Sequence, residues 1–273
     1  MNILRMPGLK TRCALYAGAA LCILMLNGCA GDAAKAPDPN QAYTASDLPE
    51  TRKRAGNRLQ LATLYYQNGK STFALDEIKQ AILIDPGWYS LYWMRGLIQM
   101  QMSDNPAAEA SFQKALSINP NALDLKHNYA ILLCKTKRGE EGLRMFDAII
   151  ADPAYEQRAK SYLERGNCQL SMDLKAQALA SFLKSYEFDA ANPVTGYKLA
   201  QLLFEQHEDT RAQFYIRRIN NSEASSAESL WLGIKVERRI GNMDTSAQLG
   251  LQLRKLFGTS PQALAYERGA FDE

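Results

Sequence analysis

The sequence is short of the residues on which most catalytic and metal sites depend. It has two histidines, His127 and His207, and His207-Glu208 is not followed by the second histidine of a zinc-protease motif. It contains no glycine-rich phosphate loop and no Gly-x-Ser-x-Gly nucleophile turn. We therefore expect no catalytic residue, no metal and no cofactor, and we interpret His127 as a packing or hydrogen-bonding residue. An enzyme remains an alternative, and a deep pocket with convergent titratable groups would reveal it.

The sequence also lacks an excess of charge. Its 32 basic residues include Arg5, Lys10 and Arg12, so 29 remain beyond the first segment, equal to the 29 acidic residues. Nucleic-acid binding needs a concentrated basic surface, and this balance argues against it. No run beyond the first segment is apolar enough to span a membrane.

The amino-terminal segment has the pattern of a secretion signal. Basic residues precede an apolar stretch at 13–26, which is too short to cross a bilayer and suits a signal-peptide core. The stretch ends in Leu26-Asn27-Gly28-Cys29, which resembles the lipobox of bacterial lipoproteins. We expect residues 1–28 to be removed and Cys29 to be acylated. A plain secretory signal with an incidental cysteine is the alternative.

The residues after Cys29 indicate the destination and the tether. Ala30 stands where an aspartate, in the sorting pattern that this segment resembles, retains lipoproteins at the inner membrane. We therefore expect a lipid anchor in the outer membrane, with the protein facing the periplasm. Residues 29–50 are rich in Ala, Asp and Pro without apolar periodicity, so they are expected to form a flexible linker before a domain at 51–273.

A period near 34 residues organises that domain. Tyr89 to Ala122 reads as two helices, with Gly96 small where they approach closely and Pro120 ending the second. Small residues recur at steps of 34, 34, 36, 34 and 33 along the chain: Ala62, Gly96, Ala130, Gly166, Ala200 and Gly233. Second helices follow with Ala and an aromatic or Ile at fixed offsets. Gly142 stands where Ala is usual in the second helices, and the sixth repeat lacks the Ala at this place as well.

This pattern resembles the tetratricopeptide (TPR) repeat. We predict an all-α solenoid of about six helical hairpins, in which stacking buries a core that no single hairpin can bury. Ser260-Pro261 and Gly269 predict a short capping helix at 260–268. An ordinary helical bundle is the alternative.

Two cysteines remain after the signal and the acylated residue are set aside. Cys134 and Cys168 lie at similar heights in the first helices of consecutive repeats, which stack side by side in a solenoid. An oxidising periplasm would favour a disulfide between them. Two buried free thiols are the alternative, because a disulfide requires Cα atoms within about 7 Å.

Binding is the activity that a TPR array favours. The first helices line its concave face, and the positions three before, one after and four after the small residue point into it. In the first repeats these positions hold Leu59, Thr63, Tyr66, Trp93, Leu97, Met100, His127 and Ile131. Such an apolar groove suits an amphipathic helix or an extended peptide. The same residues could instead fill the interior, and the sequence does not decide between the two.

Two segments resemble a particular family. Residues 127–134 (HNYAILLC) are similar to the Asn-Tyr-Gly-x-x-Leu-Cys segment of the PilF/PilW family of type IV pilus biogenesis lipoproteins, with Ala130 in place of Gly. Residues 227–235 (AESLWLGIK) and 250–257 (GLQLRKLF) are similar to that family as well. The order of signal, linker, six repeats and short tail is also the family's order, and the cysteine pair occurs in part of it.

The resemblance implies an outer-membrane, pilotin-type protein that helps the pilus secretin to localise and to multimerise, and that supports pilus stability. Its expected partners are the secretin or other pilus-assembly proteins, bound without catalysis. The alternative is another outer-membrane TPR lipoprotein, acting in barrel assembly or as an adaptor for a peptidoglycan enzyme.

Overall fold

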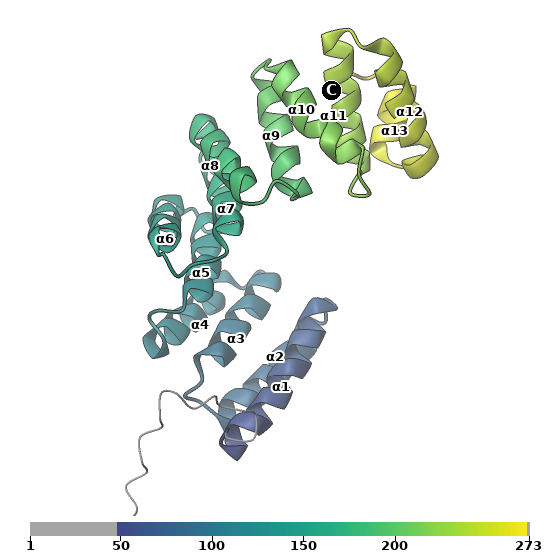
Figure 1. Ribbon diagram of the computed structural model, residues 1–273. Coiled ribbons are helices and arrows are strands. Elements are labelled where there is room, and N and C mark those ends of the chain that lie inside the picture. The colour runs from purple at the N-terminus through teal and green to yellow at the C-terminus, as the bar shows by residue number, and fades with distance from the viewer. Residues whose placement is uncertain (1–47, 272–273) are drawn as a thin grey trace, which may run out of the picture. The chain divides into compact units, whose positions relative to one another are not determined.

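The computed structural model describes residues 48–271, and in that range the chain forms thirteen helices and no strand (Figure 1). They are α1 (Glu50–Gln67), α2 (Ser71–Ile84), α3 (Tyr89–Gln101), α4 (Asn105–Ile118), α5 (Leu123–Lys135), α6 (Gly139–Ala151), α7 (Arg158–Ser171), α8 (Lys175–Phe188), α9 (Pro193–Glu205), α10 (Asp209–Asn220), α11 (Ala227–Ile240), α12 (Met243–Phe257) and α13 (Pro261–Glu267). The predicted signal, Cys29 and nearly all of the predicted linker lie outside the described residues. The last residue of that linker, Glu50, already belongs to α1.

The helices pair into six successive hairpins, α1–α2 to α11–α12, which confirms the predicted TPR solenoid. Each hairpin packs against the next, and first helices of neighbouring hairpins also touch, as α1 touches α3 and α5 touches α7 (Figure 1). The core is a series of apolar clusters in which each cluster joins neighbouring hairpins. Stacking therefore supplies the burial that one hairpin lacks.

The predicted small residues lie where two helices of a hairpin are closest. All six are buried, and in the second hairpin a Cβ added to Gly96 would come within 2.5 Å of the Phe112 ring. The fourth hairpin repeats the arrangement, because a Cβ on Gly166 would meet Phe182 at 2.5 Å. Small residue and aromatic residue are therefore complementary: the missing side chain provides the space that the ring fills.

The second and fourth hairpins also share a polar network. Arg95 Nε donates to Ser111 Oγ at 2.8 Å, and the Gln99 amide lies 2.6 Å from the same hydroxyl. The equivalent contacts in the fourth hairpin join Arg165, Ser181 and Gln169, at 2.6 and 2.7 Å. Each member stands 70 residues after its counterpart. These two hairpins are therefore similar in their buried polar contacts as well as in their apolar packing.

The connections between hairpins differ in length. Those at 85–88, 119–122 and 189–192 have four residues, whereas 152–157 and 221–226 have six. The turns inside the hairpins are tighter, and in all six of them one residue has a left-handed backbone: Gly69, Ser103, Lys137, Asp173, His207 and Gly241. His207 is thus a turn residue. The two longer connections both border cavities described below.

The carboxyl-terminal end of the array is capped, as predicted for residues 260–268. The Ser260 hydroxyl accepts a hydrogen bond from the Ala263 backbone N–H and so begins α13, whose Ala263 is fully buried against α11 and α12. The Phe271 ring then stacks on Trp231. This end of the solenoid is therefore covered by the chain itself.

Candidate functional site

Seven of the eight predicted groove residues keep part of their surface open. Leu59 and Tyr66 pack along the core of the first hairpin, and Trp93, Leu97 and Met100 along the core of the second. Ile131 packs beside the cysteines, and the Thr63 hydroxyl donates to the Leu59 carbonyl at 2.8 Å. These side chains are half-buried, so each has one side on the core and another side that a partner can reach.

His127 is the exception, and its place in the groove was wrong. Only 1% of its surface is exposed. Its Nδ1 lies 2.7 Å from the Ser161 hydroxyl, and its ring packs edge-on against Phe146. Burial lowers the pKa of His127 to about 4, so the imidazole is neutral near pH 7. The interpretation as a packing and hydrogen-bonding residue fits this geometry, and a partner cannot reach the side chain.

The six-residue connection at 152–157 explains why His127 is covered. It carries Tyr155, which is 3% exposed and whose hydroxyl lies 2.8 Å from the Ser161 hydroxyl that His127 also contacts. Arg158 fixes the same connection by donating to the carbonyls of Ile150 and Asp152. The sequence indicated this longer connection by the 36-residue step between Ala130 and Gly166, which is two residues more than the usual 34.

The same connection borders a cavity of about 310 Å³ beside Trp93. Its lining comes from the start of α3, the start of α5 and the connection: Tyr89, Trp93, Asn121, Ala122, Leu123, Asp124, Leu125, Ala154, Tyr155, Glu156 and Gln157. The lining includes two carboxylates, those of Asp124 and Glu156, and no Lys or Arg. The indole N–H of Trp93 is buried and has no hydrogen-bond partner in the described part of the chain. The Trp93 cavity thus combines aromatic walls with acidic residues.

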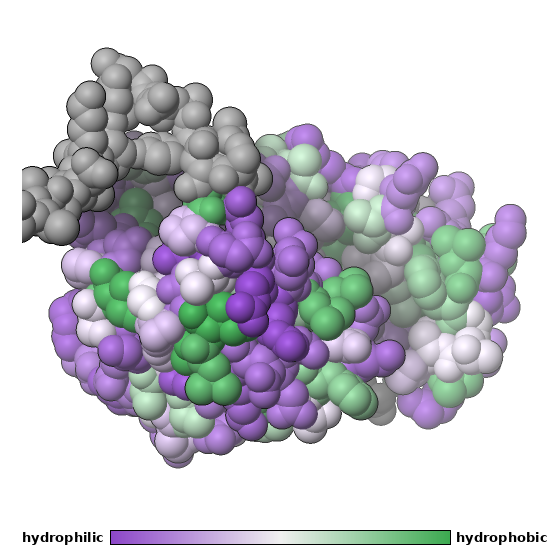
Figure 2. Space-filling model, turned by 90° about the horizontal axis from the view of Figure 1, so that it is seen from below, coloured by the Kyte–Doolittle hydropathy of each residue, from purple (hydrophilic) through white to green (hydrophobic). Residues whose placement is uncertain are grey.

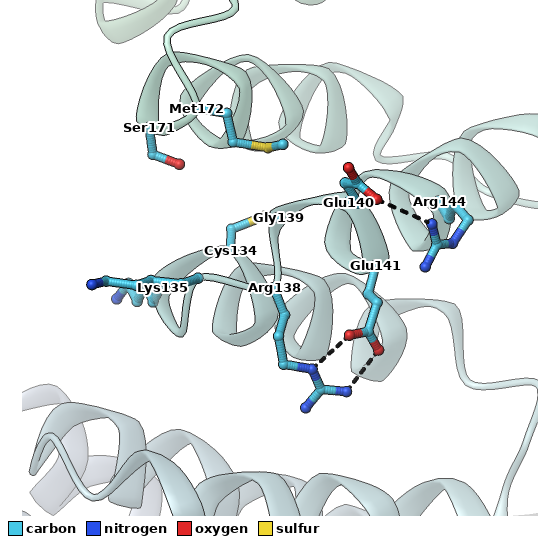
Figure 3. Close-up of a pocket in the computed structure, with 10 residues that line it drawn as sticks. Cys134, Lys135, Arg138, Gly139, Glu140, Glu141, Arg144, Ser171 and Met172 are labelled. Carbon is cyan, nitrogen blue, oxygen red and sulfur yellow. Dashed lines mark hydrogen bonds and ion pairs between the residues drawn. The ribbon is translucent and has the colours of Figure 1, made fainter.

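A second cavity, of about 720 Å³, lies where the ends of α5 and α7 face the start of α6 (Figure 3). Arg138 donates to both oxygens of Glu141 at 2.7 Å and to Glu109 at 2.5 Å, and these bonds lower the pKa of both carboxyls. Glu140 and Arg144 form a longer pair at 4.0 Å. The titratable groups of this cavity are therefore largely paired with one another.

The predicted cysteine pair stands at the edge of this cavity. The structure joins Cys134 to Cys168 by a disulfide, with Cα atoms 5.4 Å apart. Gly142 faces the bridge, because a Cβ added there would lie 2.6 Å from Cys134 Sγ and 2.9 Å from the Ala130 carbonyl oxygen. The sulfur thus occupies the space that an alanine fills in four of the other five second helices, those with Ala74, Ala108, Ala178 and Ala212. This explains the one glycine that breaks the repeat pattern.

Several large apolar residues that sequence reasoning did not select are exposed. On the first hairpin they are Leu61, Leu64, Phe73 and Leu83, of which Leu83 is 77% exposed. Figure 2 shows apolar residues in separate patches among polar ones on the face that it presents. Leu61 and Leu64 belong to α1, and Phe73 and Leu83 belong to α2.

Residues 48–271 contain neither a membrane-spanning helix nor a metal-binding cluster. No helix there has the length and apolar character needed to cross a membrane. The same residues contain no group of three or more His, Cys, Asp or Glu side chains placed to hold a metal ion.

Comparison with known proteins places these features in context. Residues 89–122 match the tetratricopeptide repeat family model. The type IV pilus assembly protein PilF of Pseudomonas aeruginosa is 27% identical over 249 residues, which are 91% of this chain and 96% of that protein. A solved structure of Pseudomonas aeruginosa PilF is similar with a TM-score of 0.70 and 25% identity, over 81% of this chain and 100% of that one. PilW, described as a widely conserved type IV pilus biogenesis factor, has a TM-score of 0.69 and 26% identity, over 78% and 97% of the two chains.

Proposed function

Because the chain belongs to the PilF/PilW family of type IV pilus biogenesis proteins, we propose that it is a non-catalytic, lipid-anchored scaffold of the outer membrane that assists assembly of the pilus secretin. The observation that carries the proposal is the similarity to PilF along 91% of the chain, together with two solved relatives that match the fold at TM-scores of 0.70 and 0.69. The lipobox-like segment ending at Cys29 supports the anchor.

The physical arrangement fits this role. An acylated Cys29 would hold the protein at the membrane, and two or more acyl chains make such a tether durable. In this proposal, a flexible linker of about 20 residues would give the domain a root-mean-square reach of roughly 25 Å. The half-buried side chains of Leu59, Tyr66, Trp93, Leu97 and Met100 would offer a secretin segment an apolar surface. Holding subunits beside the membrane raises their effective concentration for ring assembly.

Deletion of the gene, followed by immunoblotting of unheated membranes for the high-mass secretin ring, tests the proposal. We expect the ring to be lost and monomer to accumulate. An intact ring with absent or short-lived pili would instead place the function in pilus stabilisation. An intact ring with normal pili would contradict the proposal and leave a lipid-anchored TPR scaffold of another pathway.

Variants then locate the surface and the anchor. Trp93→Ala with Leu97→Ala should reduce the ring while circular dichroism shows an unchanged helix content. Leu251→Ala is the matched control, because Leu251 is 59% exposed on α12, far along the chain from α3. Cys29→Ser should abolish incorporation of labelled fatty acid and release the protein from membranes. A normal ring in the double variant would exclude the first-helix surface, formed by Leu59, Tyr66, Trp93, Leu97 and Met100, as the secretin site.

A further inference from the structure

A third cavity, of about 340 Å³, opens at the start of α9 beside the six-residue connection 221–226. Its apolar walls are formed by α9, by the end of α10 and by the connection, and its polar edge by the start of α11. The lining residues are Pro193, Val194, Tyr197, Ile219, Ala224, Ser226, Glu228 and Ser229. Val194 is 52% exposed, and Tyr197 is half-buried. Nothing in the proposed pilus role assigns this cavity, and the inference from it does not rest on that role.

The cavity shares two features with the Trp93 cavity, an aromatic residue at one repeat position and a six-residue connection at its border. Trp93 stands three residues before the small residue Gly96, and Tyr197 stands three residues before the small residue Ala200. Each cavity has the start of a first helix as one wall and borders one of the two six-residue connections. A six-residue connection thus borders both spaces, although 152–157 lies one hairpin further from Trp93 than 221–226 lies from Tyr197, and in both an aromatic ring lines the cavity.

The charged residues that line both cavities are acidic. Glu228 is exposed and forms no ion pair with a Lys or Arg in the range 48–271, and the cavity lining includes neither basic residue type. The Trp93 cavity has Asp124 and Glu156 in the same role. A carboxylate beside an aromatic ring attracts a cation, through the ion pair and through the face of the ring. Apolar walls of this extent favour a large aliphatic or aromatic side chain.

We propose that the start of α9 is a second binding site, separate from the Trp93 surface, for a protein segment in which Lys or Arg neighbours a large apolar side chain. The apolar side chain enters between Val194, Tyr197 and Ile219, and the cation pairs with Glu228. The complementary charge selects this kind of segment over an acidic one, because an acidic segment would place like charges together.

Selection of a displayed library of random short peptides on the intact mature chain tests the site. We expect Lys or Arg next to Leu, Ile, Phe, Tyr or Trp among the selected sequences. The tightest peptide, made synthetically with a fluorophore, should bind the Tyr197→Ala variant at least about tenfold more weakly by anisotropy, as for the loss of a central aromatic contact. Trp93→Ala should bind it as tightly as the parent does.

Charge variants make the test specific. Glu228→Gln should weaken binding, and Glu228→Lys should weaken it further and favour a peptide whose basic residue is replaced by Glu. Asp244→Lys is the matched control, since Asp244 is also an exposed acidic residue in the first turn of a helix but does not line the cavity. Glu228→Gln keeps the shape of the side chain and so remains informative if Glu228→Lys disturbs α11.

Four results would overturn the inference. The library could yield no binder, or binders without a basic residue, or binders whose affinity is unaffected by Tyr197→Ala and by both Glu228 variants. A loss of binding in Trp93→Ala instead of Tyr197→Ala would also overturn it, because the peptide would then occupy the first-helix surface. None of these results bears on the secretin ring, so the two proposals fail separately.

Discussion

Replacing Gly142 by Ala tests whether the disulfide and this glycine are coupled. An added Cβ would lie 2.6 Å from Cys134 Sγ and 2.9 Å from the Ala130 carbonyl oxygen, which is closer than real Cβ contacts allow. Overpacking of this kind costs about 1–3 kcal/mol. Ala in place of Gly within a helix gains about 1 kcal/mol. In the disulfide-bonded protein, we therefore expect Gly142→Ala to lower the free energy of unfolding by about 1 kcal/mol.

The same substitution should behave differently without the disulfide. In a Cys134→Ala, Cys168→Ala background the sulfur contact is gone, and the 2.9 Å contact with the Ala130 carbonyl oxygen, a backbone atom, remains. The helix propensity gain then offsets most of the remaining cost, as it does in the hairpins that carry Ala74 or Ala108 at this position. The coupling energy between the two changes is expected to be about 1–2 kcal/mol.

The assay is urea unfolding of four proteins, followed by far-ultraviolet circular dichroism: the parent, Gly142→Ala, the double cysteine variant and the combination. The parent and Gly142→Ala must be shown to be oxidised, by thiol titration in denaturant. Equal effects of Gly142→Ala in both backgrounds would refute the reasoning, because the sulfur would then not be what excludes the side chain.

Three other outcomes follow from the structure. Reduction of the Cys134–Cys168 bridge, with a sequence separation of 34, should lower the free energy of unfolding by about 4 kcal/mol in the chain-entropy model, and an unchanged urea midpoint would contradict this. Folding lowers the pKa of His127 from 6.5 to about 4, so the unfolded chain takes up the proton first as pH falls. The free energy of unfolding should therefore fall by about 3 kcal/mol between pH 6.5 and pH 4. His127→Gln should flatten that slope between pH 6.5 and 4, and parallel slopes would rule His127 out. Glu237 is fully buried and bonded by Arg217, so Glu237→Ala should cost about 2–3 kcal/mol in thermal or urea unfolding, whereas a neutral effect would show that the network is dispensable.

The six hairpins were predictable from the sequence, because several weak repeat matches at one spacing identify the repeat even where a single match would not. The spacing of Ala62, Gly96 and their successors identified the hairpins, their register and the helix faces that meet. The Ser260-Pro261 pair gave the capping helix, because a serine N-cap followed by proline has few other uses. Each of these signals is local or periodic, and the packing between hairpins then follows from stacking.

The irregular part was not predictable to the same degree. A repeat position predicts the direction in which a side chain points. How deeply that side chain is buried depends on which residues of other hairpins and connections pack against it. His127 occupies a groove position, but Tyr155 from a longer connection covers it, and only the 36-residue step hinted at that connection. The cavity at Tyr197 was hidden for a similar reason, since a shorter α10 compensates for the connection 221–226 and the step there is 33.

The shared interior of the second and fourth hairpins bears on how an array of this kind changes length. Arg95 and Arg165 hold equivalent places, and each is followed by the small glycine that admits a Phe ring. Excision of residues 96–165 would join Arg95 directly to Gly166, with Gln169, Ser181 and Phe182 already in the correct register. A chain shortened in this way should fold into four hairpins that keep the arginine–serine–glutamine network and the glycine–phenylalanine contact, while Cys168 loses its disulfide partner Cys134.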